Sequence, residues 1–195
     1  AKWPHAVAAG NVELSQRITD VCFAALAAAA AQMNVLHLPI PACGQGTMNN
    51  ITLGAPGWSF YETLGGGQGA SERGAGPSAV HVGMSNTRNT PVESLERAYP
   101  LRVERYALRR SSGGAGQYHG GDGVIRSYRA LVECSATVLS ERRTVAPPGA
   151  HGGGAGTVGI NSLNEAPLPA KFRVVMQPGD VLTVETPGGG GYGAA

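Results

Sequence analysis

The densest group of side chains able to do chemistry runs from Ser85 to Thr90. It consists of one serine, two asparagines, two threonines and one arginine, directly before Pro91. Amide and guanidinium groups suit the binding of a carboxylate, a phosphate or an amide, because they donate hydrogen bonds in fixed directions. The same residue types cap helices and stabilise loops. A substrate-binding loop and a purely structural loop are therefore both open interpretations.

His81 lies a few residues before this cluster, on the segment Ser78–Met84, which has the pattern of a strand. An imidazole there can act as a general acid or base, or as a metal ligand. No histidine or carboxylate stands at ligand-like spacing from it. The alternative is a partly buried histidine that is only hydrogen-bonded.

Two glycine-containing segments offer further polar groups. Gly44–Asn50 places Gln45 and Asn49 between glycines and a short strand, and residues 65–69 expose backbone N–H groups that can form an anion-binding nest. Neither segment has the Lys-Ser/Thr ending or the strand-to-helix position of a phosphate-binding loop. For the glycine run a structural turn is the simpler interpretation.

Cys43 is a candidate nucleophile, but the sequence assigns it no histidine and acid partner, so a small apolar residue is the alternative. Glu62 and Glu93 supply carboxylates whose mutual distance a sequence does not give. Glu141 is expected to form a salt bridge with Arg142 or Arg143 at the end of a strand.

Helices and strands must position these residues. An apolar repeat at intervals of three and four, with Asn11 as cap, predicts a helix from Val12 to Met33. Its small residues from Ala24 to Ala31 favour close approach of a neighbouring element. A second, short helix is expected after Pro91, capped by Thr90 or Asn89, with Leu95 on its buried face, ending before Pro100.

The rest of the chain predicts strands and turns. Strands are expected at 51–53, 58–64, 78–84, 101–108, 124–132, 136–139, 172–176 and 181–186, with a turn at 177–180 and turns at the glycine-rich runs. The predicted fold class is α+β, with one long N-terminal helix and a short second helix packed on a mainly antiparallel, Gly-rich β-sheet assembly. One domain covers residues 1–195, with a helix and polar-loop part (1–100) and a β-rich part (101–195).

Composition excludes several classes of protein. The formal net charge of +2 comes without a basic run, so neither nucleic acid nor a membrane is expected as a partner. Three scattered cysteines without a Cys-x-x-Cys pair indicate neither a disulfide framework nor a zinc ribbon, and a reducing cytoplasm fits best. Nothing resembles a signal peptide or a transmembrane helix, so a soluble protein is expected.

Several strings together resemble the hydantoinase B/5-oxoprolinase family, in the order in which that family carries them. They are Gly10–Glu13, Ser15–Arg17, Gln45–Asn50, Tyr61–Thr63 with Gly65–Gly67, Asn86–Glu93, Tyr99–Pro100 with Arg102–Tyr106, Gly113–Gly123, Leu139–Arg143, and Pro178–Asp180 leading to Thr186–Gly193. The resemblance covers nearly the whole chain. Its closing string resembles the C-terminus of the family, so further residues are expected on the N-terminal side.

The resemblance implies a subunit of an ATP-dependent hydrolase that opens cyclic amides of the hydantoin, 5-oxoproline or lactam type. ATP and Mg would be bound by a hydantoinase A-like partner in a hetero-oligomer, which phosphorylates the carbonyl oxygen. A divalent metal would belong to the N-terminal part of the B-type subunit, because the family's histidine motifs have no match here. This chain alone is expected to bind no cofactor and to be inactive.

The resemblance also implies roles for particular residues. Asn86, Arg88 and Asn89 are expected to orient the substrate or stabilise an oxyanion, Gln45 and Asn49 to line the same cavity, and His81 to carry a proton. Gly83 stands where the family often has a second histidine, which argues against a metal at that strand. Two alternatives remain, the same segment of an ATP-dependent ketone carboxylase and a non-catalytic scaffold module.

Overall fold

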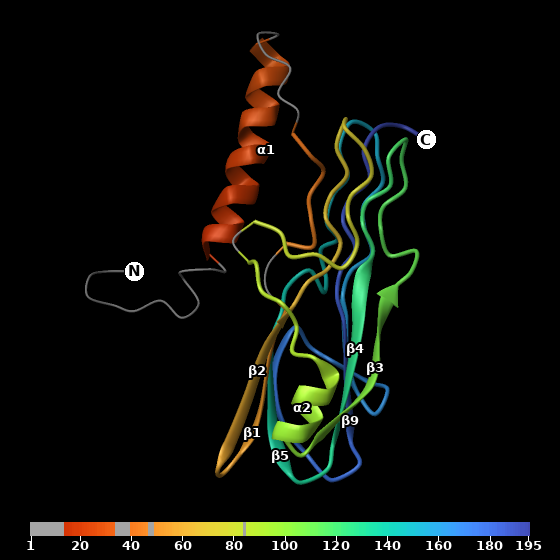
Figure 1. The fold of residues 1–195 in the computed structure, drawn as a ribbon. Coiled ribbons are helices and arrows are strands. Elements are labelled where there is room, and N and C mark those ends of the chain that lie inside the picture. The colour runs from red at the N-terminus through yellow and green to blue at the C-terminus, as the bar shows by residue number, and fades with distance from the viewer. Residues whose placement is uncertain (1–13, 34–39, 47–48, 84) are drawn as a thin grey trace, which may run out of the picture.

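The computed structural model describes residues 14–33, 40–46, 49–83 and 85–195. In these residues it contains two helices and nine strands, which confirms the α+β prediction (Figure 1). The helices are α1 (Ser15–Met33) and α2 (Val92–Ala98). The strands are β1 (Asn49–Ala55), β2 (Trp58–Leu64), β3 (Leu101–Arg109), β4 (Gly123–Ala130), β5 (Cys134–Leu139), β6 (Ile160–Leu163), β7 (Ala166–Leu168), β8 (Lys171–Met176) and β9 (Val181–Glu185).

The strands form two antiparallel sheets with one hydrophobic core between them. The first sheet has the order β2-β1-β5-β8 and the second β3-β4-β9-β6-β7. Alternating side chains point inward, for example Cys134, Ala136 and Val138 of β5 and Leu182 and Val184 of β9, all at most 3% exposed. Because β1 pairs with β5, the first and second halves of the chain share a sheet.

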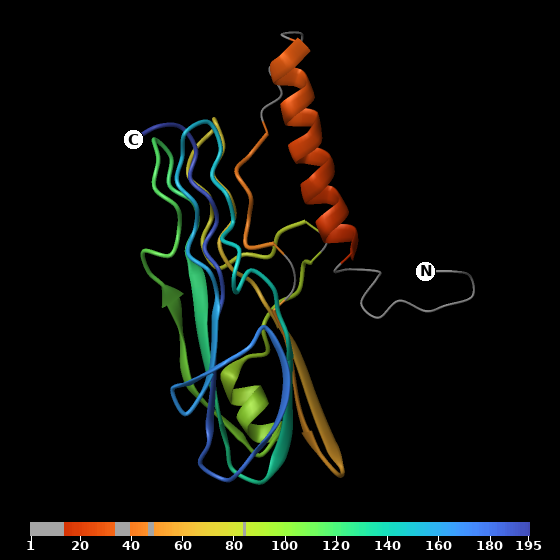
Figure 2. The ribbon, with the colours of Figure 1, turned by 180° about the vertical axis from the view of Figure 1, so that it is seen from behind.

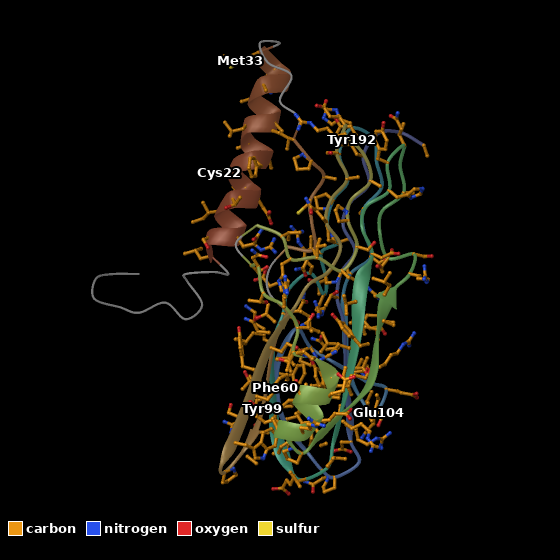
Figure 3. The ribbon with its side chains drawn as sticks, in the orientation of Figure 1. Cys22, Met33, Phe60, Tyr99, Glu104 and Tyr192 are labelled. Atoms are coloured by element: carbon orange, nitrogen blue, oxygen red, sulfur yellow. The ribbon has the colours of Figure 1, made fainter. Side chains whose placement is uncertain are left out.

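Helix α2 lies between β2 and β3, the edge strands of the two sheets (Figure 1). It inserts Leu95, which is 0% exposed, into the core, and Tyr99 just after it packs on Phe60 with ring centroids 5.3 Å apart (Figure 3). The predicted helix is confirmed, but its predicted cap is wrong. Pro91 occupies the N-cap position without a side-chain hydrogen bond, since the Asn89 side chain is bound elsewhere.

The hairpin of β6 and β7 was not predicted. Its two-residue turn, Asn164 and Glu165, has positive φ at both positions (48° and 70°), as hairpin turns of this length require. The Asn164 side chain holds the turn, because its Oδ1 accepts from Val181 N at 2.8 Å. The turn at 177–180 was predicted correctly and has Gly179 at φ +96°.

The glycine-rich runs are only in part turns. Gly152 lies in a turn, as predicted, with φ +90°, and Gly153 N donates to Ala150 O at 2.9 Å. The other runs are not simple turns, because residues 42–45, 65–70, 76–79, 112–121, 147–157 and 187–193 run side by side above the sheets, mostly as extended segments, and we call them the glycine-rich bundle (Figures 1 and 2). Backbone hydrogen bonds join segments that are far apart in the sequence. The tertiary structure, rather than local turn geometry, therefore determines the path of these glycines.

The segment 187–193 shows how the bundle is built. The N–H groups of Gly188, Gly189, Gly190 and Gly191 donate in turn to the carbonyls of Thr157, Gly121, Cys43 and Gly154, at 3.2, 2.9, 2.8 and 2.9 Å. Gly188, Gly189 and Gly190 thus bind three different segments of the bundle. Gly191 binds the same segment as Gly188, residues 147–157. A repeat of three residues per turn is that of a polyproline II helix, which has no internal hydrogen bonds and leaves its N–H groups for neighbours.

At most of its glycines such packing leaves no room for a side chain. A Cβ atom on Gly120 would lie 2.0 Å from the carbonyl oxygen of Gly189, and one on Gly188 would lie 1.9 Å from that of Ser112. The bundle therefore accounts for much of the unusual glycine content of the chain, 30 residues.

Helix α1 stands beside the bundle and confirms the predicted helix from Ser15 to Met33; Val12 and Glu13 lie outside the described residues (Figure 1). Its apolar stripe points away from the described chain, with Ile18 53% and Val21 65% exposed, whereas Gln16 is buried. Ala24 and Ala27 line a cavity of about 480 Å³ between α1 and the bundle. Neither described helix combines the length and the apolar character that a membrane span requires.

Candidate functional site

Three of the six residues that the sequence singles out, and Val80 next to a fourth, bind one place, residues 63–67, which we call the junction segment. Here β2 ends and the glycine-rich bundle begins. The contacts are Asn89 Nδ2 to Thr63 O (3.2 Å), Asn49 Nδ2 to Leu64 O (3.4 Å), Gln45 N to Gly67 O (2.7 Å), and Gly66 N to the carbonyl of Val80, the residue before His81 (2.9 Å). Segments from distant parts of the sequence are thus collected around five consecutive residues.

Gln45 and Asn49 form a buried amide pair, each 1% exposed. Asn49 Nδ2 donates to Gln45 Oε1 at 2.5 Å, and Gly66 is required beside them because its Cβ would lie 2.7 Å from that of Gln45. Gln45 Nε2 is buried and has no hydrogen-bond partner in the described part of the chain. A buried donor without an acceptor is costly, so this group is suited to a water molecule or a ligand.

Arg143 continues this network and was not among the predicted site residues. Its Nη1 donates to Asn49 Oδ1 at 2.9 Å, and its Nη2 to Asn161 Oδ1 at 2.8 Å. Burial, with a further effect of nearby Arg109, lowers the pKa of Arg143 to about 9, so the guanidinium is still charged at neutral pH. A positive charge thus lies directly behind the amide pair.

The Glu141 carboxylate faces Arg17 of α1, at 2.9 Å, and Lys171, at 3.8 Å. The expected ion pair of Glu141 with Arg142 or Arg143 stays a prediction. Arg143 Nη1 donates to the backbone oxygen of Glu141 at 2.7 Å. The string from Leu139 to Arg143 was part of the family resemblance. Such a resemblance does not indicate in which direction side chains point after the end of a strand.

His81 lies in a loop, and the predicted strand 78–84 is wrong at its described positions, where Val80 forms only an isolated bridge with Gly66. Its Nδ1 lies 3.1 Å from Ser85 Oγ and its Nε2 3.3 Å from Thr87 Oγ1. Burial lowers the pKa of His81 below its usual value of 6.5. A neutral imidazole at pH 7 is the form that can accept a proton.

The polar loop from Ser85 to Thr90 divides its side chains into bound and free ones. Asn89 is bound at both ends, because it donates to Thr63 O and accepts from the hydroxyl of Tyr106 at 2.9 Å. Asn86 and Arg88 are exposed, and Arg88 makes no hydrogen bond or ion pair with the described residues. The loop therefore presents an amide and a guanidinium outward between Ser85 and Asn89, both of which are hydrogen-bonded.

A buried ion pair, Glu62 with Arg126, fixes the end of this loop. Glu62 Oε1 accepts from Thr90 N at 2.6 Å, and Arg126 Nη2 donates to Thr90 O at 3.2 Å. Arg126 Nε lies 3.5 Å from Glu62 Oε2, and the two side chains are 0% and 3% exposed. The backbone N–H of Thr90 is thus bound by the negative Glu62, and its carbonyl oxygen by the positive Arg126.

Two tyrosines enclose the ion pair. Tyr128 donates to Glu62 Oε2 at 2.5 Å, and the Arg126 guanidinium carbon lies 4.3 Å from the ring centre of Tyr106. Burial, followed by the charge of Glu62, raises the pKa of Tyr128 well above 10, so its hydroxyl remains a donor. Sequence reasoning missed Arg126, since a strand arginine normally indicates an exposed position.

The four cavities that we describe on this part of the chain are lined by other residues than Gln45, Asn49, His81, Asn86, Arg88 and Asn89. Within the described ranges, no three His, Cys, Asp or Glu side chains gather to hold a metal ion. The predicted common cavity of these six residues stays a prediction.

Comparisons with known proteins agree with this architecture. The family model of hydantoinase B/oxoprolinase matches residues 1–195. The chain is 41% identical to 5-oxoprolinase 1 of Arabidopsis thaliana, over 97% of this chain and 14% of the plant protein. The crystal structure of an ATP-dependent caprolactamase from Pseudomonas jessenii superposes with a TM-score of 0.66 and 26% identity, covering 79% of this chain and 30% of that one.

A nucleotide-free acetone carboxylase shares the fold, with a TM-score of 0.56 and 16% identity over 79% of this chain and 26% of that chain. The chain spans only 12% to 34% of the lengths of the curated relatives that it matches. The activity of a whole relative therefore does not pass directly to these 195 residues.

Proposed function

The chain belongs to the hydantoinase B/oxoprolinase family, and from this premise we propose that it is part of an ATP-dependent hydrolase that opens cyclic amides. It would supply one wall of the substrate cavity in the B-type subunit. The names of the plant 5-oxoprolinase and of the bacterial caprolactamase, both acting on cyclic amides, support this substrate class.

The observation that carries the proposal is the polar loop, which is held at Asn89 and Thr90 while Asn86 and Arg88 are exposed and make no side-chain hydrogen bond or ion pair with the described residues. After phosphorylation the former carbonyl oxygen carries a phosphoryl group, whose negative charge persists through ring opening, and the leaving nitrogen needs a proton. The exposed Arg88 guanidinium would bind that negative charge. Neutral His81, held by two hydroxyl groups, would move the proton.

Nucleotide binding and metal binding are assigned to polypeptide outside these 195 residues. ATP and Mg would be bound by a hydantoinase A-like partner, and a divalent metal by the N-terminal part of the B-type subunit. The residues described here do not fit a metal, so no step of this proposal passes through one. The exposed apolar stripe of α1 and the small share of each relative that the chain covers support packing of that stripe against the remainder of the B-type subunit.

Two other functions follow from the same fold. The acetone carboxylase shows that this architecture also occurs in an ATP-dependent carboxylation system. The first alternative is therefore the same segment of a ketone carboxylase. The second is a scaffold module, in which α1 and the glycine-rich bundle support the complex while other residues carry out the reaction. Fold similarity does not choose between them.

ATP consumption by the reconstituted complex tests the proposed reaction. We expect hydantoin, 5-oxoproline or a lactam to raise the rate of ATP hydrolysis at least about tenfold, because phosphorylation needs the ring carbonyl as acceptor. A ketone with bicarbonate should leave the rate unchanged, and the B-type subunit alone is the control. Stimulation by the ketone pair and not by any cyclic amide would replace the hydrolase proposal by the carboxylase.

A further inference from the structure

Tyr106, on the edge strand β3, is connected to the polar loop in two ways. Its hydroxyl donates to Asn89 Oδ1 at 2.9 Å. Its ring centre lies 4.3 Å from the guanidinium carbon of Arg126, which in turn donates to the carbonyl oxygen of Thr90. Asn89 and Thr90 directly follow Arg88, whose side chain is exposed. One side chain of β3 thus reaches both loop residues next to the free guanidinium.

A β-bulge in β3 gives Tyr106 this direction. Val103 pairs with Tyr128 of β4. Tyr106, three residues further along β3, pairs with Arg126, only two residues from that partner, so Glu104 is an extra residue in the strand. In a regular strand Val103 and Tyr106 would point to opposite faces, because side chains alternate. The extra residue therefore turns Tyr106 toward Arg126 and the polar loop.

The side chain of the extra residue holds the bulge. The Glu104 carboxylate accepts from Arg129 Nε at 2.6 Å, and Arg129 Nη1 also donates to the carbonyl oxygen of Gly179, at 2.8 Å. Bulges are frequent at sheet edges and beside active sites, where they redirect a side chain. The backbone of β3 therefore imposes the direction of Tyr106, which a regular strand would not give.

We propose that Tyr106 is a positioning residue, which acts through Asn89 on the guanidinium of Arg88. The Asn89 side chain is held by the Tyr106 hydroxyl at one end and by Thr63 O, at 3.2 Å, at the other. The residue next to Arg88 is thus held from two sides. Tyr106 is 50% exposed, so its hydroxyl can be removed while the core stays intact. The inference rests on the proposed function, because it needs Arg88 to act on the substrate.

The alternative is that Tyr106 only covers the buried Arg126. Tyr106→Phe separates the two, since it keeps the ring on Arg126 and removes the hydroxyl. In the reconstituted complex, with hydantoin, 5-oxoproline or caprolactam as substrate, we expect kcat to fall about 3- to 10-fold, as for loss of one hydrogen bond. KM should not change, because the negative charge that Arg88 would bind forms only on phosphorylation, after the ring has bound. Tyr118→Phe, which removes a hydroxyl without a hydrogen bond to the described residues, is the matched control and should keep wild-type kcat.

A double variant tests whether Tyr106 acts through Arg88. Arg88→Ala removes the guanidinium, so adding Tyr106→Phe to it should lower kcat by no more than about 1.5-fold further. Amide hydrogen exchange gives a second readout, which does not involve turnover. Peptides that cover residues 85–90 should exchange at least about twofold faster in Tyr106→Phe than in the wild type, because the loop opens more often.

Wild-type kcat in Tyr106→Phe, beside a loss in Arg88→Ala, would overturn this inference and leave the proposed function standing. A further loss in the double variant as large as that in Tyr106→Phe alone, or unchanged hydrogen exchange of the loop, would overturn it as well. Wild-type turnover in Arg88→Ala, or no turnover of any of the three amides, would contradict the proposed function and this inference together.

Discussion

Alanine in place of Gly67 is expected to prevent folding or to lower the free energy of unfolding by more than about 4 kcal/mol. The added Cβ would lie 1.9 Å from the carbonyl oxygen of Gly121 and 2.3 Å from the nitrogen of Gly189. Neither backbone atom can move alone, because Gly189 N donates to Gly121 O at 2.9 Å in the same bundle. Urea denaturation followed by circular dichroism measures the loss.

Gly154→Ala is the matched control for this change. Gly154 also lies in the bundle, but its Cβ would be 3.3 Å from its nearest neighbour, the carbonyl oxygen of Ala115. We expect an effect within about 1 kcal/mol, typical of a substitution that neighbours can absorb. Equal stability of the two variants would show that close backbone contact does not hold the bundle together.

The second large effect is expected for Arg126→Met, at a cost of about 3–5 kcal/mol, because it leaves the Glu62 carboxylate buried without its counterion. Arg126 is 0% exposed and Glu62 4%, so water does not replace the lost partner. The Thr90 carbonyl loses its donor as well. Equilibrium unfolding in denaturant measures the change.

Glu62→Leu alone is expected to be similarly harmful, whereas the double variant Glu62→Leu/Arg126→Met should lose clearly less than the two single losses together. The reason is that the double change removes both charges and leaves none unpaired. Full additivity of the two losses would contradict the description of these side chains as one buried ion pair.

Most strands and both helices were predictable because their signals are local. Trp58–Leu64 was predicted with its observed bounds, and Val181–Glu185 to within one residue, from β-branched and apolar alternation. Helix α2 followed from the prolines on either side of it and from Leu95. The hairpin of β6 and β7 has no such signal, since Asn161, Ser162 and Pro167 are poor strand formers and the sheet imposes their conformation.

The glycine-rich bundle was not predictable because each of its glycines is explained by a distant segment. Gly67, for example, is required by Gly121 and Gly189, which are more than fifty positions away along the chain. The burial of Arg126 has the same kind of cause, since β4 is covered on both faces. The sequence around Arg126 does not indicate that other elements cover both faces of this strand.

For the candidate site, residue types were informative and contacts were not. The sequence singled out Gln45, Asn49 and Asn89 by their polar character, and the structure brings them to the junction segment, with His81 next to Val80, which also binds there. It did not indicate that Asn89 has a bound side chain while Arg88 is free. Arg143 was passed over because its direction after the strand end depends on Asn49 and Asn161.

Steady-state kinetics of the reconstituted complex with Arg88→Ala test the central claim most directly. Loss of one free guanidinium from the cavity wall should lower kcat/KM for the cyclic amide by about 10- to 100-fold, while gel filtration shows an intact complex. Arg110→Ala, which removes an exposed arginine outside the polar loop, should leave kcat/KM unchanged. Wild-type turnover of the Arg88→Ala complex would contradict the assignment and leave this chain as a scaffold.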